Sequence, residues 1–308
     1  MFHMSFILPF LAVLRKGGSS SSCVHFQAGP SLEMIAKEEA SFLFVAFPTV
    51  MSALLNHDDF SLAKLSKVRL INNVGAPAQL KINMAAIPNA IHITAYGSTE
   101  ITGVASFSHP EDSDDIRAYR SGRPFNGIKV KIVNPESLVE LASGEHGEIL
   151  VSGFSVLKGY YKSPEKNAEA FDEYGWFRTG DIGSVDTLDR IAYHGRIKDM
   201  LKVGGENVAA VEIESFLSQH PAVALAQVVG VPDNKLLEVA AAFVELRPNT
   251  NCSEEQLIDF CSGKIASFKV PRYIRFVKEW PMSSTKIQKF KLSEILITEL
   301  ALDKSDLS

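Results

Sequence analysis

The period of the hydrophobic pattern changes near Gly122, and this change constrains the fold more than any other feature. Before it, helix-like and strand-like segments alternate, at residues 32–39, 42–47, 50–56, 68–72 and 91–95. Such alternation indicates helices layered on a mostly parallel sheet. After Gly122, residues 129–133 and 147–151 alternate with a period of two, as antiparallel strands with one wet face do. The sequence therefore predicts an α/β fold: mixed sheets layered with helices, plus a small antiparallel β subdomain.

A third pattern begins near Lys198 and predicts a separate α+β unit. Its expected order is helix, strand, strand, helix and strand, with the first four at residues 211–216, 224–229, 239–244 and 257–261. Ser253 and Gln256 are spaced as a capping box that begins the last of these helices. We place the boundary at Lys198–Asp199, which gives residues 1–198 to a large domain and residues 199–308 to a small one.

Composition excludes several classes of protein. The 308 residues are enough for two domains, and 46% hydrophobic residues supply a core. A net charge of -5 argues against a nucleic-acid surface, since such surfaces are usually basic. Three cysteines form neither a disulfide framework nor a zinc-binding spacing. The sequence does not indicate an oligomeric state.

The apolar segment at residues 1–14 is expected to be a buried helix that ends at Gly17-Gly18. No basic region precedes it, as one would in a secretory signal, and it is shorter than the roughly 20 residues that span a bilayer. We therefore expect no transmembrane segment and a cytoplasmic location. A chain that begins inside a core-like helix also suggests that upstream residues are missing, and with them any organellar targeting sequence.

Two turns that follow predicted strands are candidate ligand sites. In residues 94–100 (TAYGSTE), Tyr96 offers a ring to cover a base, Thr99 a hydroxyl for a phosphate, and Glu100 a carboxylate for Mg2+. A plain strand-ending turn with a helix-capping threonine is the alternative. Residues 73–77 (NVGAP) would let the backbone approach a flat ligand, or form only a turn between a strand and a helix.

Three later segments carry further candidate residues. In residues 175–181 (GWFRTGD), Asp181 is suited to accept hydrogen bonds from vicinal hydroxyls, and Arg196 follows fifteen positions later. Gly204-Gly205, expected to lie directly before a helix, permits close approach of the backbone to a narrow ligand. Lys286, on a Ser/Thr-rich loop, could reach a neighbouring site as a point charge. The structural alternatives are an Asp-stabilised turn, a surface salt bridge, a plain turn and a solvated lysine.

The segments YGSTE, GWFRTGD, GRIKDMLKVGGENV and STKIQK occur in a fixed order between Tyr96 and Lys289. In this order they resemble the successive core motifs of the adenylate-forming (AMP-binding) superfamily. With the weaker match at residues 73–77, the resemblance covers nearly the whole chain, and it is nearest to acyl-CoA synthetases of the fatty-acid–CoA ligase type. It implies ATP, Mg2+ and coenzyme A as cofactors and co-substrates.

The resemblance also implies a role for each matched residue. Those that would bind the nucleotide are Gly75, Ala76, Tyr96 and Gly97 around the adenine, Thr99 at the α-phosphate, Glu100 at Mg2+, and Asp181 and Arg196 at the ribose. Lys286 would be the mobile catalytic lysine and Lys198 the hinge about which the small domain rotates. Gly204 and Gly205 would line the tunnel for the phosphopantetheine arm. The acyl pocket would be formed by Phe47-Pro48-Thr49, Gly97 and Ile101, although Phe47 and Ile101 could equally be core residues.

One departure from the family pattern concerns the phosphate loop. This loop, rich in Ser, Thr and Gly and ending in lysine, should lie well before the adenine turn. The nearest segment, residues 17–22, lacks that pattern, and residues 1–4 look like the aromatic-His element that normally follows the loop. The chain is also roughly half the usual length, so we expect an N-terminally truncated chain that adenylates poorly or not at all.

The resemblance leaves three functional classes open. The first is a CoA ligase for a fatty or other apolar acid, since the matched acyl pocket holds no charged residue that could recognise an amino group. The second is an adenylation module for a carrier protein. The third is a non-catalytic fragment that binds nucleotide.

Overall fold

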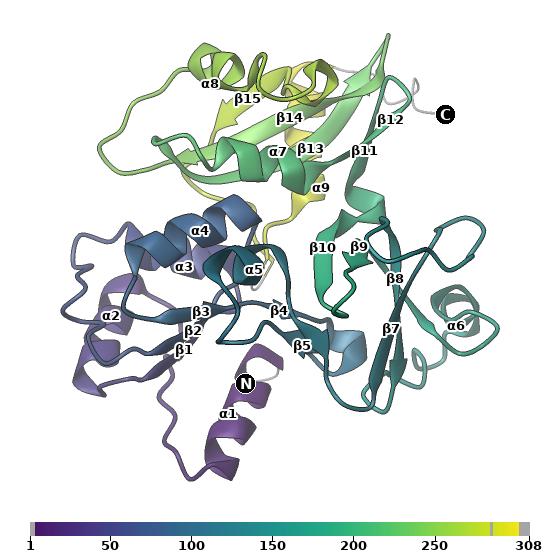
Figure 1. Cartoon of the computed structure of the whole chain (residues 1–308). Helices are drawn as coiled ribbons and strands as arrows, with labels where there is room; N and C mark the ends of the chain where they lie inside the picture. The colour runs from purple at the N-terminus through teal and green to yellow at the C-terminus, as the bar shows by residue number, and fades with distance from the viewer. Residues whose placement is uncertain (1–3, 284–285, 302–308) are drawn as a thin grey trace. The chain divides into compact units, whose positions relative to one another are not determined.

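The computed structural model describes residues 4–283 and 286–301 (Figure 1). The chain divides into two compact units. The first comprises residues up to Gly75 and Leu80–His194, and the second comprises Ala76–Gln79 and the residues from Gly195 onward. The assignment of residues 1–198 and 199–308 to a large and a small domain of the family stays a prediction.

The first unit contains the expected parallel sheet. Its strands pair in the order β1 (Phe42–Phe44), β2 (Leu70–Asn72) and β3 (Ile91–Ile93). The helices of this region are α2 (Ala28–Lys37), α3 (Pro48–Leu55) and α4 (Pro77–Ala86). Leu32, Met51 and Ile71 are almost completely buried together, so the apolar faces of α2 and α3 form one core with the sheet.

The structure divides the predicted strand at residues 91–95 into β3 and β4 (Ala95–Tyr96). The break falls at Thr94, whose hydroxyl donates to the carbonyls of Arg117 and Arg120 and whose N–H donates to Ser108 Oγ. These bonds take Thr94 out of the parallel ladder. β4 pairs instead with β5 (Ser106–Phe107), which pairs with β6 (Arg123–Pro124) in a small antiparallel sheet.

A four-stranded antiparallel sheet follows, as the period-two pattern predicts. Its strands pair in the order β10 (Ile191–Arg196), β9 (Phe177–Val185), β8 (Gly147–Gly153) and β7 (Ile128–Val133). Ile149, Val151 and Ile191 are fully buried on its inner face with Tyr96 and Ile101. The short helices of this region are η1 (Thr99–Ile101), α5 (Asp114–Tyr119) and α6 (Pro164–Ala170).

The second unit is a five-stranded mixed sheet with helices. Its strands are β11 (Met200–Val203), β12 (Glu206–Ala209), β13 (Val223–Asp233), β14 (Leu237–Leu246) and β15 (Tyr273–Phe276). Its helices are η2 (Ile197–Asp199), α7 (Ala210–Leu217), α8 (Glu254–Cys261), η3 (Ser267–Lys269) and α9 (Lys289–Glu299). The predicted α+β character is confirmed, and so is the capping box, in which Ser253 and Gln256 exchange hydrogen bonds.

The apolar segment near the start of the chain is a helix, α1 (Met4–Arg15), as predicted. The expectation that it is buried is wrong: Leu11 and Leu14 are 56% and 51% exposed, because no other described element covers that face. Across residues 4–283 and 286–301, every helix is too short or too polar to cross a membrane.

Candidate functional site

Tyr96 and Asp181 form the centre of the candidate site in the first unit. Tyr96 ends β4 and Asp181 lies in β9, and the Tyr96 hydroxyl donates to Asp181 Oδ2 at 3.0 Å. Both residues are buried, at 5% and 4% exposure. Folding thus brings together a phenol and a carboxylate from motifs that are 85 positions apart.

Electrostatics fixes the direction of this hydrogen bond, with Tyr96 as the donor. Burial, together with the neighbouring Asp181 carboxylate, raises the pKa of Tyr96 well above its ordinary value. The phenol therefore stays protonated at neutral pH and donates. The ring of Tyr193 lies 6.4 Å from that of Tyr96 and is 41% exposed. Sequence reasoning missed Tyr193, and only its place three residues before Arg196 could have drawn attention to it.

A second buried carboxylate, Glu148, holds the segment that carries Asp181. Glu148 Oε2 accepts from Arg178 Nη2 and Nε at 2.7 and 3.1 Å, and its Oε1 accepts from the Gly180 N–H at 3.1 Å. The residue is 1% exposed. It therefore fixes the backbone on the N-terminal side of Asp181 from the adjacent strand. Nothing in the sequence pointed to this role, because Glu148 looks like a polar residue of an alternating strand.

The turn after Tyr96 leaves no room for a side chain at Gly97. A Cβ there would lie 2.1 Å from the Gly103 carbonyl oxygen and 2.7 Å from Val104 Cα. Beyond it, Thr99 is exposed and begins η1. The Glu100 side chain accepts a hydrogen bond from the Tyr160 hydroxyl at 3.2 Å. Tyr160, which the sequence analysis did not name, thus orients the carboxylate predicted to bind Mg2+.

Glu100 fits the way in which Mg2+ is commonly held with a nucleotide. That ion is usually bound by one or two carboxylates together with substrate phosphates, rather than by an all-protein cage. Glu100 Oε1 faces Tyr160, and the carboxylate has a second oxygen to offer. Within the described residues, no three His, Cys, Asp or Glu side chains cluster closely enough to hold a metal.

The turn at residues 73–75 rests on a buried amide and imidazole network. Asn73 is fully buried, its Nδ2 lies 3.3 Å from His92 Nδ1, and its Oδ1 accepts from Asn83 Nδ2 at 3.2 Å. His92 Nε2 lies 3.2 Å from the Ile87 carbonyl, which accepts only, so Nε2 carries the proton and Nδ1 accepts from Asn73. Burial lowers the pKa of His92, so the ring is neutral. The network holds in place the backbone that leads to Gly75.

The predicted acyl-pocket residues lie in two places. Phe47 and Pro48 are half-buried at the N-terminus of α3, where Phe47 is the extended residue before the helix. Ile101 is fully buried in the apolar cluster that includes Tyr96. That burial agrees with a core role for Ile101, and its contact with an acyl chain stays a prediction.

Gly204 and Gly205 are the two central residues of a β-hairpin. Val203 of β11 pairs with Glu206 of β12, and both glycines have positive φ, at 59° and 89°. A two-residue hairpin turn with this backbone favours glycine strongly. The sequence analysis placed these glycines directly before a helix. The structure instead puts β12 between them and α7, so the geometric reason for both glycines is the hairpin.

The remaining predicted residues also belong to the second unit. Arg196 ends β10, and Lys198 is exposed in η2. Lys286 is exposed on the loop before α9; the two residues before it, and residues 1–3 of the aromatic-His segment, lie outside the described part of the chain. Ala76 is grouped with this unit too. The roles of these residues beside Tyr96 and Asp181 stay predictions.

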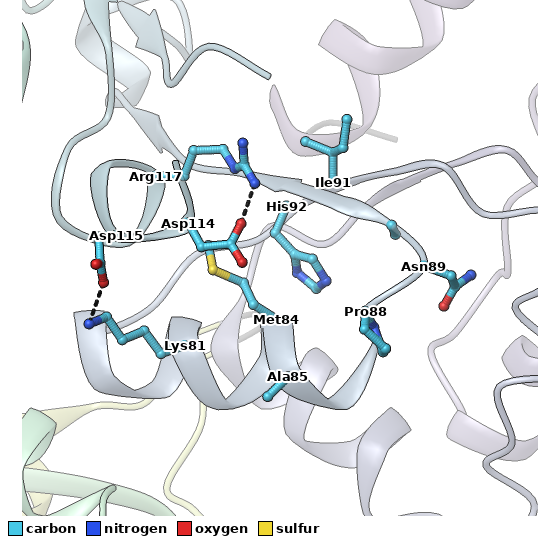
Figure 2. A pocket seen from close by; sticks show the side chains of 11 residues that line it. Lys81, Met84, Ala85, Pro88, Asn89, Ile91, His92, Asp114, Asp115 and Arg117 are labelled. Carbon is cyan, nitrogen blue, oxygen red and sulfur yellow. Dashed lines mark hydrogen bonds and ion pairs between the residues drawn. The ribbon is translucent and has the colours of Figure 1, made fainter. Parts of the chain in front are cut away.

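A cavity of about 500 Å3 lies elsewhere in the first unit, against α4, β3 and α5 (Figure 2). Its lining includes His92 and two ion pairs: Lys81 with Asp115 at 2.6 Å, and Arg117 with Asp114. None of the predicted site residues lines it. Because these charged groups pair with each other, we assign the cavity no part in the candidate site.

Family models match most of the chain. A model described as AMP-binding enzyme matches residues 1–161, and one described as AMP-binding enzyme C-terminal domain matches residues 212–286. The chain belongs to the family of AMP-binding enzymes. The resemblance drawn from the sequence motifs is thereby confirmed.

Curated relatives within this family include acyl-CoA synthetases. The chain is 38% identical over 97% of its length to the putative acyl-CoA synthetase YngI of Bacillus subtilis, covering 55% of that protein. It is 36% identical over 90% of its length to the human mitochondrial medium-chain acyl-CoA ligase ACSF2, covering 46% of it. The chain thus spans about half the length of the curated relatives it matches.

Solved structures of AMP-binding enzymes share the fold. The anthranilate CoA ligase AuaEII in complex with anthranoyl-AMP is 34% identical, with a TM-score of 0.81 over 92% of this chain and 56% of that one. The amide bond synthetase McbA from Marinactinospora thermotolerans is 27% identical, with a TM-score of 0.81 over 95% of this chain and 60% of that one. The predicted α/β fold class is confirmed.

Proposed function

We propose that this AMP-binding chain derives from an ATP-dependent carboxylate–CoA ligase that acts through an acyl-adenylate on a fatty or other apolar acid. In the first half-reaction, a carboxylate oxygen attacks the α-phosphorus of ATP, the bond to pyrophosphate breaks, and acyl-AMP forms. In the second, the thiol of coenzyme A attacks the acyl carbon, loses its proton, and displaces AMP. The products are an acyl thioester, AMP and pyrophosphate.

The observation that carries this proposal is the pairing of Tyr96 with Asp181. An aromatic ring next to a buried carboxylate suits a nucleoside, which presents a flat base and vicinal hydroxyls to its binding site. Gly75, Ala76 and Gly97 are the other adenine-binding residues we propose, and Arg196 would donate to the ribose.

The remaining proposed residues interact with the charged phosphates. Mg2+ bound at Glu100 would neutralise phosphate charge, while the Thr99 hydroxyl would donate to the α-phosphate. Lys286 would stabilise the charge that develops on the carboxylate and α-phosphate oxygens. Rotation about Lys198 would then exchange Lys286 for the Gly204–Gly205 hairpin, so that one site serves both half-reactions.

We propose further that the phosphate loop is lacking. The nearest candidate, residues 17–22, follows helix α1, is exposed, and lacks the family's loop pattern and the lysine that ends it. Without backbone N–H groups cradling the β- and γ-phosphates, ATP would be poorly held. Thioester formation from a supplied acyl-adenylate does not need those groups, and we expect it to persist.

We propose an apolar carboxylic acid as the substrate because the expected pocket residues, Phe47, Pro48 and Ile101, carry no charge. The name of ACSF2 points to medium-chain acids, and that of AuaEII to an aromatic acid. We favour a medium-chain fatty acid, in fatty acid metabolism, because the curated relatives at 36% identity carry that name. We keep the cytoplasm as the proposed location, with the mitochondrion, named for ACSF2, as the alternative.

The alternatives are an adenylation module for a carrier protein and a non-catalytic nucleotide-binding fragment. One experiment separates them. The purified chain is given synthetic octanoyl-adenylate with coenzyme A, or with a phosphopantetheinylated carrier protein, and release of AMP and thioester is followed. Palmitoyl- and anthranoyl-adenylates test the acid. Gly205→Trp, which would block the thiol tunnel, and Lys286→Ala, which leaves it open, are the matched variants.

Thioester formation with coenzyme A that is lost in Gly205→Trp and kept in Lys286→Ala would support the CoA ligase. Thioester formed only on the carrier protein would favour the adenylation module. A folded chain that binds AMP but transfers no acyl group would leave the non-catalytic fragment.

A further inference from the structure

We propose that Glu214 and Lys289 form a buried anchor that positions Lys286. Both are positioning residues, and the inference rests on the proposed role of Lys286 in adenylation. All of the groups involved lie within the second unit.

The anchor is a group of hydrogen bonds that joins Glu214 and Lys289 to the backbone of Val228 in β13. Lys289 Nζ lies 2.6 Å from Glu214 Oε1 and 3.2 Å from the Val228 carbonyl oxygen. The same Glu214 oxygen accepts from the Val228 N–H at 2.8 Å. Carboxylate, ammonium and both backbone groups of Val228 therefore satisfy one another. Glu214 is only 7% exposed and the Lys289 side chain is 25% exposed, so solvent screens this pair less than a surface pair.

The place of β13 in the sheet explains why such a set is needed. Among the described strands, β13 pairs only with β14, so its outer edge has no neighbouring strand. Backbone groups on an unpaired edge need partners from side chains or water. Glu214 of α7 and Lys289 of α9 provide them at Val228. One turn further along α9, Ser293 Oγ donates to the Gly230 carbonyl at 3.0 Å.

Lys289 also lies directly after the loop that contains Lys286. It is the first residue of α9, and the Gln288 N–H before it donates to the Pro281 carbonyl at 2.8 Å, closing the loop. Within the loop, the Ser283 N–H donates to the Lys286 carbonyl at 2.8 Å, and the Lys286 N–H donates to Ser283 Oγ at 3.1 Å. Lys286 itself is exposed.

Because the base of the loop is held and the Lys286 side chain is exposed, the loop delivers the Lys286 charge to a defined position. The anchor thus fixes the origin of Lys286 while leaving its side chain available to substrate. A purely structural role for the pair would affect both half-reactions alike. A positioning role affects adenylation, which uses Lys286, and spares thioester formation, which does not.

The chain itself supplies a matched control. Glu212 lies on the same helix as Glu214 and also pairs with a lysine, Lys269, at 2.6 Å, but its side chain is 53% exposed and the pair is remote in sequence from the Lys286 loop. Glu214→Gln keeps an acceptor for the Val228 N–H and removes the charge. Lys289→Met keeps the aliphatic stem. Glu212→Gln is the control.

Hydrogen exchange of the full chain is measured first, because it does not depend on activity. Amides of residues 286–288 are expected to exchange about tenfold faster in Glu214→Gln and Lys289→Met than in the wild type or Glu212→Gln, while β14 is unchanged. The double variant should be no worse than the worse single variant, because both remove one interaction. Equal exchange in Glu214→Gln and Glu212→Gln overturns the proposal.

Single-turnover adenylation and thioester formation are then compared in the same variants. The wild type is expected to adenylate poorly, so acyl-AMP is detected with radiolabelled ATP. We expect this residual adenylation to fall by a further factor of about 10 to 100 in both anchor variants, since small displacements of a catalytic group cost this much, with thioester formation retained. Equal loss of both half-reactions overturns the positioning role. If the wild type forms thioester but no detectable acyl-AMP, the exchange result decides whether the anchor holds the loop. If it performs neither half-reaction, the proposed function fails, and the exchange result again decides for the anchor.

Discussion

The Tyr96 hydroxyl donates a 3.0 Å hydrogen bond to Oδ2 of Asp181 across the interior of the first unit. The end of a two-residue strand is thereby linked to a carboxylate in the antiparallel sheet. Both partners are buried, so neither has water to replace the other.

Tyr96→Phe should therefore destabilise the chain although it removes only one oxygen. It removes a donor from a buried carboxylate, which we expect to cost about 1–3 kcal/mol of unfolding free energy in urea denaturation. Tyr174→Phe is the control, because Tyr174 is 78% exposed. Equal effects of the two substitutions would contradict the importance we give to the buried bond.

Glu148→Gln should loosen the segment that carries Asp181. The amide still accepts from the Gly180 N–H, but the charge that binds Arg178 is lost, and we expect a loss of about 1–3 kcal/mol. Glu33→Gln breaks a pair with Lys64 whose acid is 67% exposed, and should change stability by less than about 1 kcal/mol. Affinity for AMP, measured by titration, should fall in Glu148→Gln and stay unchanged in Glu33→Gln.

Two glycines should respond differently to alanine because their constraints differ. In Gly97→Ala the new Cβ meets backbone atoms at 2.1 and 2.7 Å, so the turn must move. In Gly205→Ala nothing lies within 4 Å, and only the positive φ is unfavourable, at about 1–2 kcal/mol. Thermal unfolding should show the larger loss for Gly97→Ala. A larger loss for Gly205→Ala would show that the turn at Gly97 relaxes easily.

His194 should make stability depend on pH. Burial, with smaller contributions from His146 and Arg120, lowers the pKa of His194 from 6.5 to about 4. The unfolded chain binds this proton more readily, so the folded state is fully favoured above pH 6.5 and loses that advantage as the pH falls toward 4. After allowance for partial exposure we expect about 1–2 kcal/mol.

The measurement is urea denaturation between pH 7 and pH 4.5, for the wild type and for His194→Gln. The variant keeps a polar partner for Ser184, whose Oγ lies 3.0 Å from His194 Nε2, but has no titrating ring. Its stability should fall less over this range. Parallel curves would show that His194 is not the group responsible.

The sequence predicted local structure best where one physical rule acted alone. Alternation with a period of two identified β7 and β8, although residues 147–151 of β8 are buried on both faces, so the expected wet face is not found there. The Ser253–Gln256 spacing identified the start of α8, because a capping box is satisfied within four residues. The fixed order of the motifs identified the family before any coordinates were known.

Tertiary contacts decided the rest. The strand predicted at residues 91–95 breaks because Thr94 binds the Arg117 and Arg120 carbonyls, which are more than twenty positions away. The helix at Met4–Arg15 forms as predicted but is not buried, because burial depends on what covers a helix and not on its own composition. Local pattern carries no information about either contact.

The same division holds for the candidate site. The sequence by itself determined the family, the α/β class, and which residue types stand at each motif, because these depend on residue order along the chain. Only the tertiary structure decided that Tyr96 bonds Asp181, that Glu148 supports Gly180, and that Lys289 anchors to Glu214 and Val228. Those partners are distant in sequence, and the hydrogen bonds between them exist only after the strands that carry them have packed together.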